Sequence, residues 1–206
     1  MHLIKYFNVF FALFIIFPVY GNDCLSYKIT PKITISSPDW TKTILQPTTP
    51  MDLWHGNVVA TLIDDYDITT NINSIDGGYC VSLKSVNATI GYNNFDVQID
   101  IRHTPNTCSY NAILKHEEKH IQTYLSLIES FKSDLHKFVY SASDSIMPIF
   151  IREYSEIDDA VTMLNNELQS HPDLILIKQK IMAAQEIENK RIDKNETGYE
   201  LKKCFE

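Results

Sequence analysis

Residues 109–138 read SYNAILKHEEKHIQTYLSLIESFKSDLHKF, and this stretch decides how the rest of the chain is interpreted. It contains neither proline nor glycine, and Ser109 at its start is of a type that caps helices. Its apolar residues recur at helical spacing, at Ile113, Leu114, Ile121, Tyr124, Leu125, Ile128, Phe131, Leu135 and Phe138. The pattern predicts one long amphipathic helix from about Ser109 to Phe138.

The helix carries the motif H-E-x-x-H at residues 116–120. His116 and His120 are one turn apart and project from the same face, where two imidazoles can hold one Zn²⁺ at about 2.0–2.1 Å per nitrogen. Glu117 can take a proton from a metal-bound water, so we expect it to be a general base. The alternative is a solvent-exposed helix face that carries these residues by chance. All three border the apolar stripe, which favours a half-buried metal site.

A catalytic zinc normally has three protein ligands and a water. The metzincin position, six residues after His120, is Ser126, which excludes that class. His136 lies sixteen residues beyond His120, about 24 Å along the same helix, and cannot reach the metal. His103, at the end of a predicted strand, could line the cleft. Three acidic residues on the next predicted helix remain open as the third ligand: Glu153, Glu156 and Glu167.

The first 21 residues have the features of a secretory signal peptide. Lys5 provides the positive start, residues 7–19 are almost entirely apolar, and a cleavage point precedes Asn22. An uncleaved anchor is the alternative. No other segment approaches the roughly 18 apolar residues that a membrane span needs. We therefore expect residues 22–206 to form one secreted or periplasmic domain.

The charge balance bears on possible partners. The chain has 18 Lys and Arg against 26 Asp and Glu, a formal net charge of −8, and it has no basic patch. Nucleic acid is therefore not an expected partner. A hydrophobic content of 44% is typical of a globular chain.

Four cysteines follow the signal segment, and in an oxidising compartment we expect two disulfides. Residues 80–92 and 95–103 look like two strands joined by a turn at Asn93-Asn94. That register places Cys80 opposite a position next to Cys108, which predicts the disulfide Cys80–Cys108. Cys24 then pairs with Cys204 by elimination.

The order of predicted elements indicates an α+β fold. Short strands precede the H-E-x-x-H helix, and the segment 57–66 and the two strands above suggest a mostly antiparallel sheet. A second helix is expected from about Pro148 to Gln169, and a third from Pro172 to about Lys190. Asp76-Gly77-Gly78 is a turn signal.

The strand residues 80–83 and 97–99, followed by TCSYNAILKHEEKH at 107–120, resemble a family of bacterial secreted proteins identified as predicted Zn-dependent proteases, formerly a domain of unknown function. That resemblance implies an acidic C-terminal motif, which the stretch RIDKNETGY at 191–199 is similar to. It favours Asp193, Glu196 or Tyr199 as the third ligand. We rank Glu196 first, because glutamate often completes a pair of histidines that share a helix.

Two functions follow from these features. The first is an exported zinc metallopeptidase that hydrolyses peptide bonds in a peptide or protein substrate, with Glu117 as general base. The second is a non-catalytic envelope or binding protein that retains the same fold. A protein that binds a metal without hydrolysis is an intermediate case.

Overall fold

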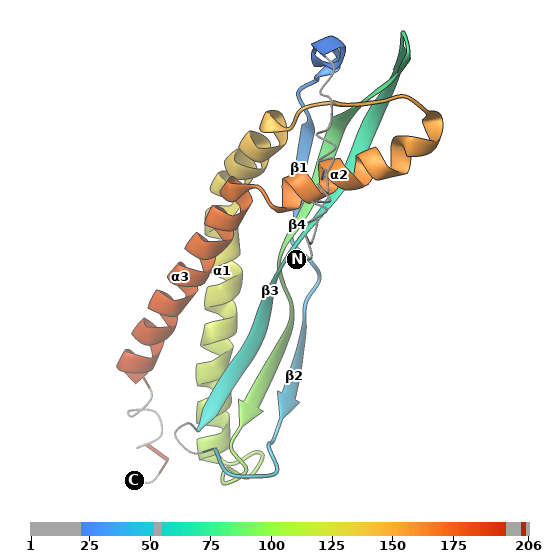
Figure 1. Cartoon of the computed structure of the whole chain (residues 1–206). Coiled ribbons are helices and arrows are strands. Elements are labelled where there is room, and N and C mark those ends of the chain that lie inside the picture. The colour runs from blue at the N-terminus through green and yellow to red at the C-terminus, as the bar shows by residue number, and fades with distance from the viewer. Residues whose placement is uncertain (1–21, 52–54, 197–202, 205–206) are drawn as a thin grey trace, which may run out of the picture.

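The computed structural model describes residues 22–51, 55–196 and 203–204; the predicted signal peptide lies outside them. These residues form a five-stranded sheet and three α-helices, with the last strand placed between the first two helices in the chain (Figure 1). The elements in chain order are η1 (Asn22–Tyr27), β1 (Lys32–Ser36), β2 (Thr41–Leu45), β3 (Gly56–Ile75), β4 (Gly78–Ile99), α1 (Cys108–Ser145), β5 (Ile149–Ile151), η2 (Tyr154–Glu156), α2 (Ile157–Gln169) and α3 (Pro172–Glu196).

A single long hairpin, β3–β4, forms the longest strand pairing in the sheet. β3 pairs antiparallel with β4 along its length, from Gly56 opposite Ile99 to Ile75 opposite Gly78. The turn lies at Asp76-Gly77, where Gly77 has φ +78°, a conformation that favours glycine. The predicted turn at Asn93-Asn94 is wrong, because both asparagines lie inside β4.

The other edge of β4 is shared by three short strands. β5 pairs antiparallel with residues 79–81, whereas β1 and β2 pair parallel with residues 85–89 and 94–98. The fold is α+β, but the prediction of a mostly antiparallel sheet is wrong: β1, β4 and β2 run parallel to one another. The parallel strands come from the Thr- and Pro-rich segment before β3, in which prolines limit strand length.

Alternating apolar residues of β4 supply much of the core. Val86, Ala88, Ile90 and Tyr92 are all buried, and the alternation continues after an irregularity with a second set of buried residues, Phe95, Val97 and Ile99. Tyr92 and Phe95 stack with Tyr124 of α1, with ring centroids 5.4 and 6.3 Å from that of Tyr124. The amphipathic face of α1 is thereby fixed against the sheet.

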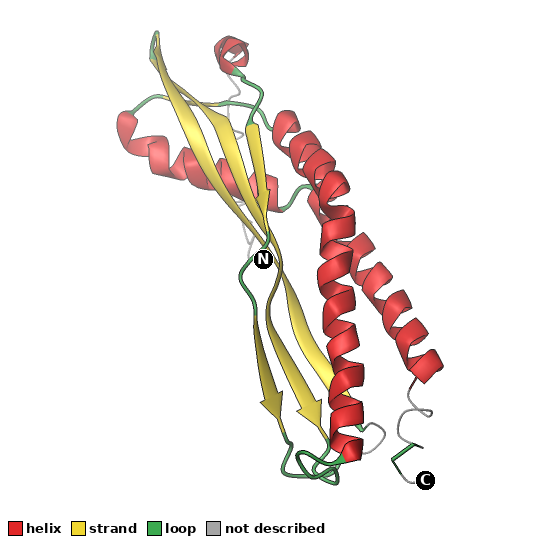
Figure 2. Ribbon diagram, turned by 180° about the vertical axis from the view of Figure 1, so that it is seen from behind, coloured by secondary structure: helices red, strands yellow, loops and turns green. Residues whose placement is uncertain are grey.

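The helices lie along and across this sheet. α1 runs beside it over most of its length, and α3 packs along α1 (Figures 1 and 2). α2 crosses the strands in front in Figure 1 and behind in Figure 2, so it covers one face near the hairpin end. Tyr92 of β4 donates a 2.6 Å hydrogen bond to Gln185 of α3, and Lys178 of α3 forms an ion pair with Asp64 of β3. These contacts fix α3 relative to the sheet.

The predicted helices have different ends in the structure. α1 is capped by Thr107, whose side chain accepts a hydrogen bond from the Tyr110 amide, and it continues to Ser145. Residues 149–151 form β5, so α2 begins later than expected, whereas α3 begins at Pro172 as predicted. Within the described ranges, no helix is both long and apolar enough to span a membrane.

All four cysteines are in disulfides, but the predicted pairing is wrong. Cys24 is bonded to Cys80, and Cys108 is bonded to Cys204. The prediction depended on the misplaced turn at Asn93-Asn94. Because that turn does not exist, Cys80 lies near the hairpin end of β4, far along the strand from Cys108 at the start of α1. The bond Cys108–Cys204 joins the C-terminal segment to the helix that carries the H-E-x-x-H motif.

Candidate metal centre

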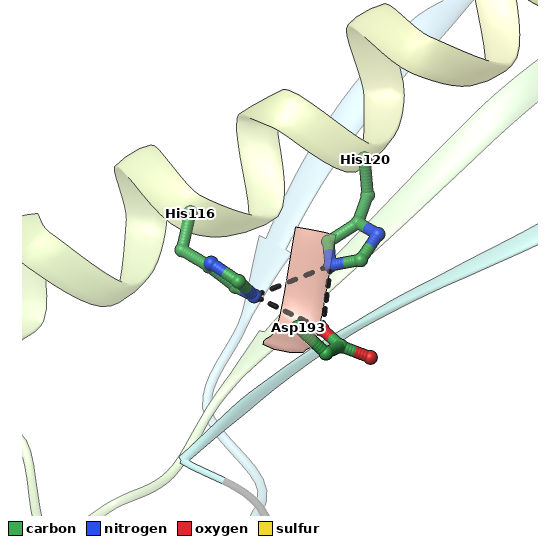
Figure 3. A group of neighbouring side chains, drawn as sticks. All are labelled: His116, His120 and Asp193. Atoms are coloured by element: carbon green, nitrogen blue, oxygen red, sulfur yellow. Dashed lines mark hydrogen bonds and ion pairs between the residues drawn. The ribbon is translucent and has the colours of Figure 1, made fainter. Parts of the chain in front are cut away.

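Two histidines of α1 and one aspartate of α3 converge on a single point (Figure 3). Nε2 of His116 and Nε2 of His120 each lie 3.2 Å from Oδ1 of Asp193, and they lie 3.2 Å from each other. The two histidines point the same way because they are one turn apart on α1. Asp193 reaches them because α3 packs along α1.

The three side chains differ in their exposure to solvent. The side chains of His116 and His120 are 12% and 9% exposed, whereas that of Asp193 is 39% exposed. A metal ion held here would therefore be anchored on a mostly buried wall and reached from the Asp193 side. Two imidazole nitrogens and one carboxylate oxygen are a donor set typical of catalytic zinc, with a fourth position left for water.

Asn189 and Tyr124 form a second layer behind His120. The side-chain oxygen of Asn189 lies 2.9 Å from Nδ1 of His120, and Nδ2 of Asn189 donates a 2.8 Å hydrogen bond to the hydroxyl of Tyr124. An amide oxygen can only accept, so it places the proton of His120 on Nδ1. The lone pair on Nε2 then faces Asp193, as a metal ligand requires.

Glu117 is buried beside this group, at 5% exposure. Burial and, as the smaller cause, the nearby negative charge of Asp193 together raise its pKa from 4.5 to about 8. A cation between the two carboxylates would oppose both effects and favour the ionised form. The site therefore holds a carboxyl group whose proton affinity depends strongly on the charge next to it.

Gly56 gives Glu117 the space that it occupies. A Cβ atom on Gly56 would lie 2.5 Å from Oε1 of Glu117 and 2.5 Å from a methyl carbon of Ile113. The start of β3 thus approaches α1 closely at this point, because residue 56 has no side chain. The Glu117 carboxylate packs directly against a strand backbone.

Glu118 lies outside this arrangement. Its Oε1 accepts a 2.5 Å hydrogen bond from Nζ of Lys42 on β2, and its side chain is 44% exposed. The two adjacent glutamates therefore have different surroundings. Glu117 packs against the start of β3 and lies near Asp193, whereas Glu118 forms a surface ion pair with the edge strand.

The structure brings together some of the residues singled out from the sequence and not others. Asp193 joins His116 and His120, whereas the side chain of Glu196 and the whole of Tyr199 lie outside the described part of the chain. Among the described residues, the other candidates do not join this group: His103, His136, Glu153, Glu156 and Glu167. Asp193 is therefore the third ligand candidate that the described geometry supports.

Sequence analysis missed two residues of the site, Asn189 and Gly56. Asn189 precedes Asp193 by one helical turn, so the spacing N-x-x-x-D on α3 faces the spacing H-x-x-x-H on α1. This spacing indicates that Asn189 and Asp193 share one face of α3, but it points to the site only when the packing of α3 on α1 is known. No local pattern marks Gly56.

No protein-family model, no curated protein and no solved structure matches this chain. The resemblance to bacterial Zn-dependent proteases therefore stays a prediction from the motif residues. What the site does must be argued from its own geometry.

Proposed function

We propose that the chain is an exported zinc-dependent metallopeptidase that hydrolyses peptide bonds. One observation carries the proposal: His116, His120 and Asp193 place three ligand atoms within 4.8 Å of one another, with the carboxyl group of Glu117 buried beside them. This combines a three-ligand catalytic donor set with a candidate proton acceptor. The resemblance to predicted Zn-dependent proteases supports the same function.

Each residue has a distinct role in the proposed reaction. His116, His120 and Asp193 would hold Zn²⁺, which supplies a polarised substrate carbonyl and a water of lowered pKa. Glu117 would act as general base toward the attacking water and would pass its proton to the leaving amine. Asn189 keeps His120 in the tautomer that binds through Nε2.

Export is supported by the two disulfides, Cys24–Cys80 and Cys108–Cys204, because disulfides form and persist in oxidising compartments. The apolar segment before Asn22 is the expected export signal. We therefore place the proposed peptidase in the periplasm or outside the cell.

The decisive test compares metal content and hydrolysis in matched variants. The oxidised wild-type chain should carry about one zinc per chain by emission spectroscopy and should cleave fluorescein-labelled casein. Glu117→Gln should keep the zinc and lose hydrolysis by about 10²–10⁴-fold or more, because an amide cannot accept the proton. Glu118→Gln is the control, since it lies one residue away in a surface ion pair, and its activity should stay within about twofold.

Two outcomes would contradict the proposal. A chain that binds no added zinc, or whose zinc content is unaffected by Asp193→Ala and His116→Ala, has a different site. Zinc binding without hydrolysis of casein or of a mixed peptide library would instead favour the second candidate, a binding protein that retains a metalloprotease-like fold.

A further inference from the structure

A second pair of imidazoles lies outside the site described above. His55 immediately precedes β3, and His103 lies in the loop between β4 and α1. Nδ1 of His55 is 3.0 Å from Nε2 of His103, with ring centroids 5.1 Å apart and planes at 71°. His116 and His120 have nearly the same geometry, with nitrogens 3.2 Å apart, centroids 5.0 Å apart and planes at 77°.

Backbone hydrogen bonds hold both histidines in place. The carbonyl of His55 accepts a 2.9 Å bond from the Asp100 amide, and the His103 amide donates a 3.0 Å bond to the Asp100 carbonyl. The Gln46 side chain donates a further 2.9 Å bond to the carbonyl of His103. The two rings therefore face each other on a fixed frame, which lowers the conformational cost of holding a shared ligand.

The carboxylate of Asp100 is engaged by hydrogen bonds that hold this backbone, so we do not count it as a third ligand beside the two imidazoles. It accepts bonds from Nε and Nη2 of Arg102, each 2.8 Å long, and from the amides of Arg102 and Met51. Asp100 is fully buried, so these bonds pin the turn that carries His103. The atoms that face each other between this turn and the start of β3 are Nδ1 of His55 and Nε2 of His103.

Exposure differs between the two rings. His103 is 8% exposed, whereas His55 is exposed. An ion shared by the two would thus be held from the buried side by His103, and water could complete its shell from the His55 side. Burial and the neighbouring His55 lower the pKa of His103, which favours the neutral imidazole that a metal ion binds.

We propose that Nδ1 of His55 and Nε2 of His103 chelate a divalent transition-metal ion, Cu²⁺ in preference to Zn²⁺. Two bonds of about 2.1 Å to one ion place their nitrogens about 3.0–3.4 Å apart, which includes the spacing of this pair and that of His116 and His120. Cu²⁺ also stands at the top of the affinity order for such ligands. The competing explanation is a plain N–H···N hydrogen bond between the rings.

The test removes the first metal site so that only the second is measured. The background is the full oxidised chain with His116→Ala and His120→Ala, and the probe is Cu²⁺ at pH 7.5. Equilibrium dialysis should find one Cu²⁺ per chain, and electron paramagnetic resonance should show coupling to nitrogen. Adding His55→Ala should raise the Cu²⁺ dissociation constant at least about tenfold and remove that coupling. His136→Ala, an exposed histidine of α1, is the matched control and should change neither.

Either of two results overturns the proposal: the background chain binds no Cu²⁺, or His55→Ala leaves its affinity and spectrum unchanged. His55 is exposed, so its replacement should not unfold the chain, and a thermal melt verifies this. If the background chain itself fails to fold, the same comparison is made in the wild-type chain, where His55→Ala should reduce bound Cu²⁺ from two ions to one. The result is independent of whether His116 and His120 serve a peptidase.

Discussion

Asn189 on α3 reaches across to α1 and fixes His120, with its side-chain oxygen 2.9 Å from Nδ1 of that ring. The same amide group donates to the hydroxyl of Tyr124, whose ring packs on Tyr92 and Phe95 in the core. The orientation of a candidate metal ligand is thereby coupled to the packing of the sheet. A helix-to-helix contact of this kind would act on a bound metal without touching it.

Asn189→Ala should lower the zinc affinity of the chain by about 10–100-fold, because the ring of His120 loses the group that selects its tautomer. Competition with a zinc-binding dye at pH 7.5 measures this. Lys190→Ala is the control on the next residue, where an exposed ion pair with Glu186 is all that is lost. Equal affinity in both variants would show that Asn189 does not act on the metal site.

Gly56→Ala should displace the Glu117 carboxylate, because the new methyl group would lie 2.5 Å from Oε1. We expect hydrolysis of labelled casein to fall by about tenfold or more while zinc content stays at the wild-type level. Part of the clash involves Ile113, so a melting curve must accompany the assay. The double variant Gly56→Ala with Ile113→Leu separates the two causes: leucine has no Cγ2 methyl group to clash with the new Cβ, so stability should recover but activity should not.

The two disulfides should have different effects on the metal. Replacing Cys108 and Cys204 by serine should weaken zinc binding, because that bond ties the segment after Asp193 to the start of α1. Replacing Cys24 and Cys80 should leave zinc affinity unchanged. Each pair of replacements should destabilise the chain by about 2–5 kcal/mol, as for other native disulfides. Parallel zinc titrations and urea unfolding measure both effects, and equal zinc affinity in the two variants would contradict this assignment.

Glu117 should make the metal-free chain less stable as the pH rises. Its pKa increases from 4.5 to about 8 on folding, so the folded state favours the protonated form. The resulting stability is fully present below pH 4.5 and is lost as the pH rises toward about 8. In the presence of a chelator, the melting temperature of wild type relative to Glu117→Gln should therefore fall between pH 5 and pH 8.5. A constant difference would show that Glu117 titrates normally.

The sequence predicted local features of the site and missed the distant ones. His116, Glu117 and His120 are on one helix, and the periodicity of that helix can be counted along the chain. Asp193 comes from another helix, 77 residues beyond His116, and its approach depends on how α3 packs. Helical spacing says which residues share a face, but not which other helix covers that face.

The misplaced turn at Asn93-Asn94 has a physical origin. Asn93-Asn94 has the composition of a tight turn, but Asn94 instead bonds to Asp96 on its own strand and to Thr41 on β2. The β3–β4 ladder is irregular at this point, with Tyr92 opposite Leu62 and Phe95 opposite Ala60, so the two asparagines form an irregularity within β4 and not a turn. The wrong disulfide pairing followed directly from that misplaced turn.

Strand β4 is the common partner of every other strand, and this has a kinetic consequence. The hairpin with β3 is local, whereas β1 and β2 must wait for β4 to exist before they can pair with it, about 53 residues away in sequence. Long-range parallel pairing is slow, because the entropy of loop closure is lost before contacts compensate for it. The hairpin is thus the expected nucleus, and the N-terminal strands remain without partners until it forms. A chaperone that shields residues 32–45 during this interval would speed recovery of the native chain, whereas one that binds the helices would not.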